Sequence, residues 1–341
     1  LGSAALKQHD MLDTIVVAGE DHRFLVAEQS REIGFESIVS ILEPEPKNTA
    51  PAITMAALQS VSEGGDALLV VTPADFTVGD EGMFSKAILS ALSTVTDSSI
   101  TILGVKPSYP NTGYGYVCAE KTNDLNSFIV KNFVEKPDSV TAQSYLDDGR
   151  YYWNAGIFVL KASVWLDALM NSRPDIYHAT KAAWADGTEE ALSGLRFLRP
   201  SDQLFRAIPA ESIDYAVMEN CFKCDIRVQM IQFEAGWSDL GSWDAVSEVL
   251  PMKTMGNAFV GDVLSAGTTN TLVHASSRTV AVVGLDDIVV IETPDAVLVS
   301  EKSKSQNVKD IILDLVTANR TDHLVHRKVY RPWGWFDVLE E

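Results

Sequence analysis

Apolar, β-branched runs in the first third of the chain alternate with stretches of helical spacing, and this alternation constrains the fold most. The runs cover residues 14–19, 37–44, 67–75 and 99–105. The helical patterns between them cover residues 20–34, 48–65 and 82–95. Strands that are apolar throughout and alternate with helices are typical of a parallel sheet covered on both faces. The pattern therefore predicts an α/β fold.

One of these runs, "LLVVTPAD" (residues 68–75), continues directly into a carboxylate. In open α/β sheets the ligand crevice lies outside the carboxyl ends of the strands, where Asp75 is expected. Asp is also a common turn or helix-cap residue after a strand. The pattern alone leaves both interpretations of Asp75 open.

The pattern changes twice further along the chain. After residue 105 strands and loops with a few helices suggest a lobe for the substrate. From Gly256 onward, short strands follow one another at close spacing, as in a β-solenoid, before a helical stripe of Val308, Ile311, Ile312 and Leu315. We expect domains over residues 1–250 and 251–305, and a connecting segment over 306–341. The repetitive unit is expected to serve packing or a dimer surface.

Composition excludes some partners. The net charge of −20 argues against a nucleic-acid backbone, which is bound through basic patches. No apolar run is long enough to span a bilayer, and no signal peptide is recognisable, so neither a membrane nor export is expected. Three cysteines without framework spacing favour the cytoplasm. The first residue is Leu, which favours a fragment of a longer protein.

Two short motifs could hold a metal. "CFKC" (Cys221 and Cys224) has C-x-x-C spacing, and "HLVH" brings His323 close to His326. A structural zinc site needs about four ligands, and neither motif has a second pair in view. We therefore expect no redox or zinc function from them.

Five stretches near expected strand ends carry polar groups suited to phosphate and sugar. They are "EPEPKNTAPA" (43–52), "TPAD" (72–75), "TGYGYV" (112–117), "FVEKPD" (133–138) and "GWSDLGSWD" (236–244). Gly113 and Gly115 allow a backbone to approach a ligand closely. Taken singly, each stretch is a weak signal, because a Glu-Lys-Pro turn is usually a solvated corner.

In this order the stretches resemble the sugar-1-phosphate nucleotidyltransferases, and more narrowly the mannose-1-phosphate guanylyltransferases found in bifunctional bacterial enzymes that also isomerise mannose 6-phosphate. The matching blocks run from "DHRFLVAEQ" to the end of the chain. They include "NTAPAI" (48–53), "FVEKP" (133–137), "YYWNAGIF" (151–158), "SIDYAVME" (212–219) and "GWSDLGSWDAV" (236–246). The resemblance implies a Rossmann-like nucleotide-binding α/β domain with a mostly parallel sheet, followed by a left-handed parallel β-helix.

The resemblance also implies a reaction and its residues. GTP and mannose 1-phosphate would give GDP-mannose and pyrophosphate, with Mg²⁺ held by Asp75 and Asp239. Lys136 would meet the sugar phosphate, and Glu135, Asn154, Gly113 and Asp214 would lie near the sugar. The base pocket would be lined by Asn48, Thr49 and Pro51. A homo-oligomer through the β-helix would be in keeping with these expectations.

The chain departs from the family's pattern in three places. The family opens with a strand and a glycine-rich loop, G-x-G-x-R-x-x-P, and this chain has no such motif. Strongly reduced or absent turnover is therefore expected from this polypeptide by itself. Phe76 replaces a usual His, and Pro46-Lys47 replaces Gly-Arg.

"VYRPWGWF" (329–336) resembles the entry to a cupin-type isomerase domain, whose metal-binding histidines do not follow, so isomerase activity is not expected.

Two alternatives stay open from the sequence. Another nucleotidyltransferase of the class would use glucose 1-phosphate with UTP or dTTP, because base choice does not follow from the pattern. A non-catalytic or regulatory protein on the same scaffold would fit the missing loop and Phe76.

Overall fold

The structure is a computed structural model, and it describes residues 14–35, 38–63, 65–122, 127–192, 195–223, 226–318, 320, 328–331 and 334–337. Its contacts divide the chain into two compact units. The larger unit holds the chain up to Ala74 and residues Val78–Trp237. The smaller unit holds Asp75–Thr77 and the chain from Ser238 onward. The domain boundaries expected near residues 250 and 305 stay predictions.

The first sheet of the larger unit has four strands in the order β1-β2-β9-β8. They are β1 (Ile15–Gly19), β2 (Ile38–Glu43), β9 (Leu195–Arg199) and β8 (Thr188–Leu192). β1, β2 and β9 run parallel, and β8 is antiparallel to β9. The chain leaves β1 through η1 (Glu20–His22) and α2 (Arg23–Glu32), which together fill the expected helical stretch.

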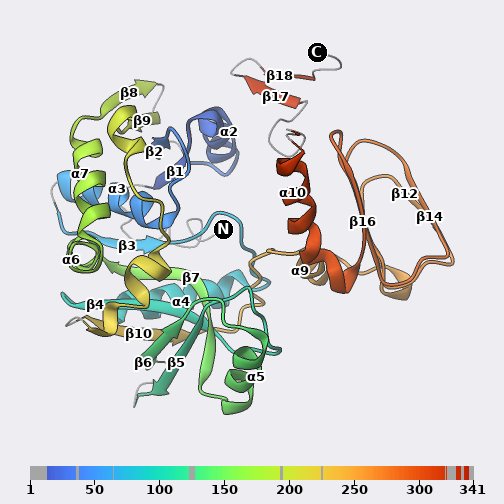
Figure 1. Ribbon diagram of the computed structural model, residues 1–341, viewed down its shortest axis with the longest axis horizontal. Coiled ribbons are helices and arrows are strands. Elements are labelled where there is room, and N and C mark those ends of the chain that lie inside the picture. The colour runs from blue at the N-terminus through green and yellow to red at the C-terminus, as the bar shows by residue number, and fades with distance from the viewer. Residues whose placement is uncertain are drawn as a thin grey trace. The chain divides into compact units, whose positions relative to one another are not determined.

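The second sheet of the larger unit has six strands in the order β3-β7-β4-β10-β6-β5 (Figure 1). The strands are β3 (Leu68–Val71), β4 (Ser99–Val105), β5 (Tyr116–Lys121), β6 (Ser127–Val134), β7 (Tyr151–Lys161) and β10 (Arg227–Gln232). β3 and β4 run in the same direction, as the sequence predicts, but β7 lies between them and is antiparallel to both. The fold is therefore a mixed α/β architecture.

β3 is less buried than its composition predicts. An apolar run such as "LLVV" predicts a strand that is covered on both faces. In the structure Leu68 is 45% exposed and the other three residues are half-buried. The reason is position, because β3 is the edge strand of its sheet and pairs on one side with β7. β1 is likewise an edge strand, with all five residues half-buried.

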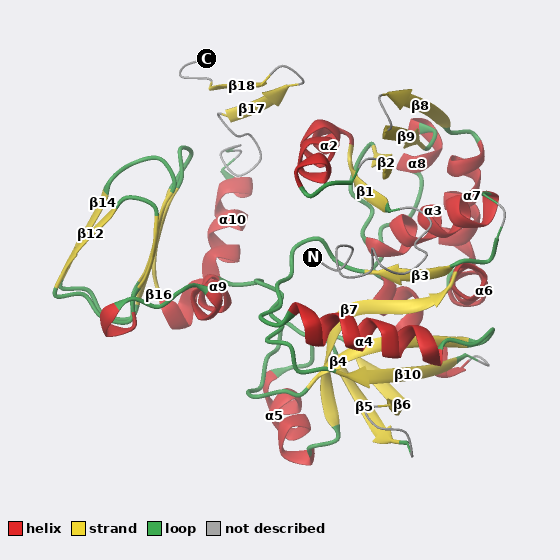
Figure 2. Ribbon diagram, turned by 180° about the vertical axis from the view of Figure 1, so that it is seen from behind, coloured by secondary structure: helices red, strands yellow, loops and turns green. Residues whose placement is uncertain are grey.

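Helices cover the six-stranded sheet and join it to the first sheet (Figures 1 and 2). They are α3 (Thr49–Ser62), α4 (Glu81–Thr94), α5 (Ser139–Asp148), α6 (Ala162–Ser172), α7 (Pro174–Ala185) and α8 (Asp202–Arg206). One continuous core contains residues of both sheets, such as Ile41 and Ile102, together with residues of α3, α6 and α7. α4 packs on β4, β7 and β10, and none of its buried residues belongs to that core.

The smaller unit contains the short strands that the sequence predicts. They are β11 (Ala258–Val260), β12 (Val263–Ala266), β13 (Leu272–Ala275), β14 (Val280–Val283), β15 (Ile288–Glu292) and β16 (Val297–Glu301). β11, β13 and β15 stack in parallel, and so do β12 and β14. This stacking is that of a β-helix-like domain. The remaining elements are η4 (Thr254–Gly256), α9 (Trp243–Val249), η5 (Lys302–Asn307), α10 (Val308–Thr317), β17 (Lys328–Arg331) and β18 (Gly334–Asp337).

Equivalent positions of successive coils hydrogen-bond to one another. Thr269 donates to Asp286, and Asn270 donates to the Asp287 carboxylate at 2.8 Å. Glu292, which is almost completely buried, accepts from the backbone N–H groups of Ser277 and Arg278. These bonds satisfy polar groups at the corners of the coils, so that the apolar interior of Ala258, Leu272, Val289 and Ile291 can stay dry.

Candidate active site

The first candidate site is a cluster of four polar side chains in the larger unit, which we call the Lys136 cluster: Glu135, Lys136, Asn154 and Asp214. Glu135 and Lys136 follow directly after β6, and Asn154 lies within β7. Asp214 begins a π-helical turn, η2 (Asp214–Met218). The Lys136 ammonium lies 2.9 Å from a Glu135 carboxylate oxygen, and the Asn154 amide donates to Asp214 at 3.1 Å.

Glycine provides the space for this cluster. Asn154 donates its backbone N–H to the carbonyl of Gly115 at 2.8 Å. A Cβ built on Gly115 would lie 2.5 Å from the Glu135 carboxylate, so any larger residue would displace the end of that side chain. Gly113, two residues earlier, is exposed, and its N–H donates to the Asn111 side chain at 2.7 Å. Gly115 therefore lets the Glu135 side chain lie against the backbone.

The cluster holds more negative than positive charge. Burial raises the pKa of Asp214 to about 7, and repulsion from Glu135 adds to the rise. The hydrogen bond from Lys136 to Glu135 is the largest cause of a raised pKa for the ammonium, which therefore stays charged. Its side chain is 57% exposed, whereas that of Glu135 is 8% exposed. The cluster thus combines one accessible cation, Lys136, with enclosed oxygen acceptors and the Asn154 amide.

The second candidate region is the start of α3. Asn48 has a positive φ of 68°, and its side chain caps the helix by accepting from the Thr49 N–H at 2.8 Å. The Thr49 hydroxyl accepts from the Ile213 N–H at 2.8 Å, and so ties this segment to the residue before Asp214. Asn48 and Thr49 are exposed, while Pro51 is buried in the first turn.

Glu43 is a functional candidate that the sequence reasoning did not single out. It is the last residue of β2, and its Oε1 is buried without a hydrogen-bond partner among the described residues. Burial raises the pKa of this carboxyl to about 7. The available signal was a charged residue closing the apolar run "IVSILE" five positions before Asn48. A buried carboxyl oxygen without a partner is costly to keep unless a ligand uses it.

The third candidate feature is the carboxylate pair, Asp75 and Asp239, both in the smaller unit. Thr77 and Ser238 exchange backbone hydrogen bonds of 2.9 and 3.0 Å as an antiparallel bridge. Asp75 lies two residues before this bridge and Asp239 one residue after it. The bridge brings together the two chain segments that carry Asp75 and Asp239, which are 164 positions apart in the sequence.

The local backbone holds the Asp239 carboxylate. Its Oδ1 accepts from the Gly241 N–H at 2.9 Å, and a Cβ on Gly241 would lie 2.6 Å from its Oδ2. Asp75 is exposed and Asp239 half-exposed. Two carboxylates offering oxygen ligands fit a hard divalent cation that keeps waters and substrate oxygens in its shell. Among the described residues no group of three or more His, Cys, Asp or Glu is placed to hold a metal.

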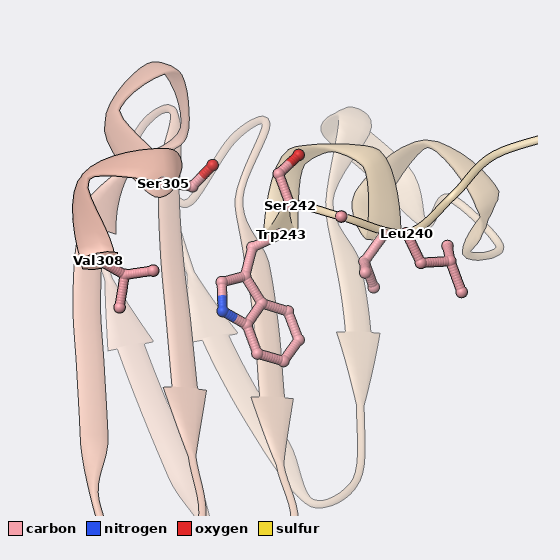
Figure 3. A pocket seen from close by; sticks show the side chains of 7 residues that line it. Leu240, Ser242, Trp243, Ser305 and Val308 are labelled. Carbon is pink, nitrogen blue, oxygen red and sulfur yellow. The ribbon is translucent and has the colours of Figure 1, made fainter. Parts of the chain in front are cut away.

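A small cavity of about 150 Å³ lies beside the residues that follow Asp239, within the smaller unit (Figure 3). Its lining residues are Leu240, Gly241, Ser242, Trp243, Val246, Ser305 and Val308. Figure 3 shows the Trp243 indole between Leu240 and Val308. The lining carries no charged side chain, so this cavity does not suit a phosphate.

Several other sequence predictions fall partly outside the described residues. Cys221 is buried and its thiol donates to the Met218 carbonyl at 3.0 Å, but Cys224, His323 and His326 lie outside the described residues. The segment that resembles the entry to a cupin domain is described at 328–331 and 334–337, where it forms the β17–β18 hairpin. None of the described helices combines the length and apolar character that crossing a bilayer would require.

Family models match both parts of the chain. The nucleotidyl transferase model matches residues 3–254. A second model, the MannoseP isomerase/GMP-like beta-helix domain, matches residues 261–315. The two matches agree with the mixed α/β unit and with the stacked short strands.

Curated relatives are similar over nearly the whole chain. A xanthan biosynthesis protein, XanB, of Xanthomonas campestris is 41% identical over 96% of this chain and 68% of its own length. A mannose-1-phosphate guanylyltransferase of Salmonella montevideo is 42% identical over 96% and 69%. One of Escherichia coli K12 is 39% identical over 96% and 68%.

Solved structures give the same result. A Thermus thermophilus structure, titled a mannose-1-phosphate geranyltransferase, has a TM-score of 0.75 at 26% identity and covers 89% of this chain and 84% of that one. A Helicobacter pylori structure, titled a mannose-6-phosphate isomerase, has a TM-score of 0.60 at 31% identity and covers 66% and 84%. Together with the family models and the relatives, these likenesses show that the chain belongs to the nucleotidyl transferase family, in the group of the mannose-1-phosphate guanylyltransferases.

Proposed function

We propose that this protein transfers a guanylyl group from GTP to mannose 1-phosphate, giving GDP-mannose and pyrophosphate. A phosphate oxygen of mannose 1-phosphate attacks the α-phosphorus of GTP. The new P–O bond forms as the bond from the α-phosphorus to the pyrophosphate oxygen breaks. Little covalent chemistry is required of the protein, so positioning and charge neutralisation are its main contributions. The relatives named for this reaction support the proposal.

The observation that carries the proposal is the composition of the Lys136 cluster. A sugar phosphate needs one cation for its phosphate, and acceptors and donors for its hydroxyls. Lys136 offers the exposed cation, while Glu135, Asn154 and Asp214 offer the hydrogen-bonding groups beside it. We assign Lys136 to the phosphate, and the other three to the sugar. Gly113 and Gly115 would allow the backbone to approach the sugar ring.

The carboxylate pair is proposed to hold Mg²⁺. Bound there, the ion would neutralise charge on the nucleotide phosphates and on the pyrophosphate that leaves. The residues' own part would be to supply oxygen ligands, for which Asp75 is exposed and Asp239 is held by the Gly241 N–H. Asp75 and Asp239 are therefore the proposed metal ligands of this reaction.

Glu43 supports guanine as the base, a choice that the sequence pattern left open. Guanine presents two adjacent donors, N1–H and the N2 amino group, to a single carboxylate. Uracil and thymine present one donor between two acceptors, which a carboxylate would repel. The unpartnered Glu43 Oε1, at the end of β2 and five residues before Asn48, suits the guanine edge. We propose that Glu43 reads the base, and that Asn48, Thr49 and Pro51 shape its surroundings.

GTP and mannose 1-phosphate are thus the proposed partners, and the cytoplasm is the proposed compartment. A homo-oligomer through the β-helix-like domain also remains a proposal. UTP- or dTTP-dependent transfer to glucose 1-phosphate is the second candidate within the class.

A substrate panel tests the proposal. The protein as its gene encodes it would be assayed for pyrophosphate release with GTP, UTP, dTTP and ATP, each with mannose 1-phosphate or glucose 1-phosphate, with and without Mg²⁺. We expect GTP with mannose 1-phosphate and metal to give the highest kcat/KM. A higher value for UTP or dTTP with glucose 1-phosphate would contradict the proposal. If none of the substrate pairs gives metal-dependent turnover, the result would favour a non-catalytic scaffold.

A further inference from the structure

Glu219 ends the block "SIDYAVME" but is not one of the residues assigned above. It lies directly after η2, the π-helical turn that begins at Asp214. Its backbone N–H donates to the Asp214 carbonyl at 2.9 Å. Its carboxylate accepts the backbone N–H of Glu135, 84 residues away, at 3.1 Å. One residue therefore bonds to both chain segments that make the Lys136 cluster.

The segment held by Glu219 has a strained backbone. Lys136 has a φ of 47°, a value that L-residues rarely adopt, and Pro137 follows it. A residue before proline is normally restricted to extended conformations. Such a conformation is unfavourable by itself and persists where surrounding contacts fix it. The contacts at this turn are the Glu135 N–H to Glu219, and the Lys136 N–H to the Tyr114 carbonyl at 3.2 Å.

Glu219 acts on the backbone of the turn and not on the charge of Lys136. The ion-pair partner of Lys136 is Glu135, and the groups that raise the pKa of Lys136 are Glu135, Tyr215 and Asp214. The Glu219 carboxylate is directed at a main-chain amide instead. Its effect on Lys136 therefore passes through the position of the chain.

We propose that Glu219 is a positioning residue: its carboxylate fixes the Glu135–Lys136 backbone relative to the Asp214 turn, and so presents the Lys136 ammonium to the phosphate of the sugar substrate. The inference rests on the proposed function of the cluster. It assigns to Glu219 a role in binding mannose 1-phosphate and none in binding GTP or metal.

Two conservative variants separate position from charge. Glu219→Gln keeps the length of the side chain and an oxygen acceptor but removes the charge. Glu219→Asp keeps the charge but is one methylene shorter, so it does not reach the Glu135 N–H. We expect Glu219→Asp to raise the KM for mannose 1-phosphate about tenfold, as for a lost hydrogen bond to a charged group, with the KM for GTP unchanged. Glu219→Gln should stay within about threefold of the wild type.

Asn220→Ala is the matched control. The Asn220 side chain donates to the Tyr215 carbonyl at 3.2 Å, so this variant loosens the same turn without touching the Glu135 N–H. It should leave the KM for mannose 1-phosphate near the wild-type value. Thermal unfolding would check that all three variants are folded, and calorimetric titration with mannose 1-phosphate would give the same order of affinities.

The outcomes distinguish the inference from the function beneath it. Impairment of Glu219→Gln with Glu219→Asp near the wild type would show that the charge matters, and would overturn the positioning role. No change in either variant, or an equal change in Asn220→Ala, would overturn it as well. If the wild type itself does not use mannose 1-phosphate with GTP, the proposed function fails, independently of Glu219.

Discussion

The Lys136 cluster and the carboxylate pair are built in opposite ways. In the cluster, side chains bond to one another and to distant backbone groups: Asn154 to Asp214, Lys136 to Glu135, and Glu219 to the Glu135 N–H. The carboxylate pair depends on a backbone bridge, between Thr77 and Ser238, and on the Gly241 N–H. The cluster is partly enclosed, whereas Asp75 is exposed.

This difference matches the ligands proposed for each region. A sugar has a fixed arrangement of hydroxyls, so preorganised side chains recognise it at low entropic cost. A hard cation such as Mg²⁺ brings waters and phosphate oxygens with it, so two accessible carboxylates are sufficient. We therefore expect changes in the cluster to act on one substrate, and changes in the pair to act on catalysis as a whole.

The largest effect is expected from the carboxylate pair. Asp75→Asn or Asp239→Asn should lower metal-dependent kcat about 10²–10⁴-fold, since neutralising charge on phosphates is worth several kcal/mol. Affinity for mannose 1-phosphate should stay unchanged. Pyrophosphate release against Mg²⁺ concentration measures the effect, with Asp97→Asn, which alters an exposed carboxylate paired with Lys161, as control. Retained turnover would remove that carboxylate from the mechanism.

Lys136→Gln should have the next largest effect. Removing the single exposed cation of the cluster should lower kcat/KM for mannose 1-phosphate about 10²-fold, while the KM for GTP changes little. Steady-state kinetics with each substrate varied in turn would separate the two. Lys131→Gln, which alters another exposed lysine within β6, the strand that precedes Lys136, serves as the control. A rise in the KM for GTP of equal size would contradict the separation of the two regions.

Glu43→Gln should change base preference. The NH₂ group of the introduced Gln side chain would face the N2 amino group of guanine, which is also a donor. Xanthine has a carbonyl at C2 instead, and that carbonyl can accept from the amide. We expect kcat/KM for GTP to fall about tenfold or more, and the ratio of XTP to GTP to rise by a similar factor. Glu45→Gln, on the same segment and paired with Lys47, is the control. An unchanged ratio would leave Glu43 without a role in base recognition.

The smallest effect is a pH-dependent one on stability. The folded-state pKa of Asp214 is raised to about 7 from 3.8, so the folded protein retains a proton that the unfolded chain releases. The free energy of unfolding of the wild type should therefore fall as the pH rises from about 4 to about 7. Asp214→Asn lacks this loss and should become more stable than the wild type by about 1–2 kcal/mol near pH 8, with no gain near pH 4. Urea unfolding across this pH range measures it.

Asp202→Asn, which alters a surface carboxylate paired with Arg206, should show no such crossover. If Asp214→Asn tracks the wild type at every pH, Asp214 is ionised in the folded state. In that case the inference that the cluster is enclosed and that Asp214 retains a proton would be wrong.

Much of the architecture could be predicted from local pattern. The expected strands at 14–19, 37–44 and 99–105 correspond to β1, β2 and β4, because apolar runs bounded by glycine and helical spacing are local signals. The helices at 48–65 and 82–95 correspond to α3 and α4 for the same reason. The short strands after residue 256 also formed as expected. The position of β7 between β3 and β4 was not predictable, because a pairing across some ninety residues leaves no local signal.

The sequence by itself determined which residue types were available: an acid after "LLVVTP", a Glu-Lys-Pro turn, and an Asp between glycines and tryptophans. Tertiary structure alone decided what those residues do to one another. It buried Glu43 Oε1 without a partner among the described residues, paired the segments that carry Asp75 and Asp239 through the Thr77–Ser238 bridge, and set Glu219 against the Glu135 N–H. The physical reason is range. Helix and strand preferences act over a few residues, whereas burial and hydrogen bonding between segments depend on how the whole chain packs.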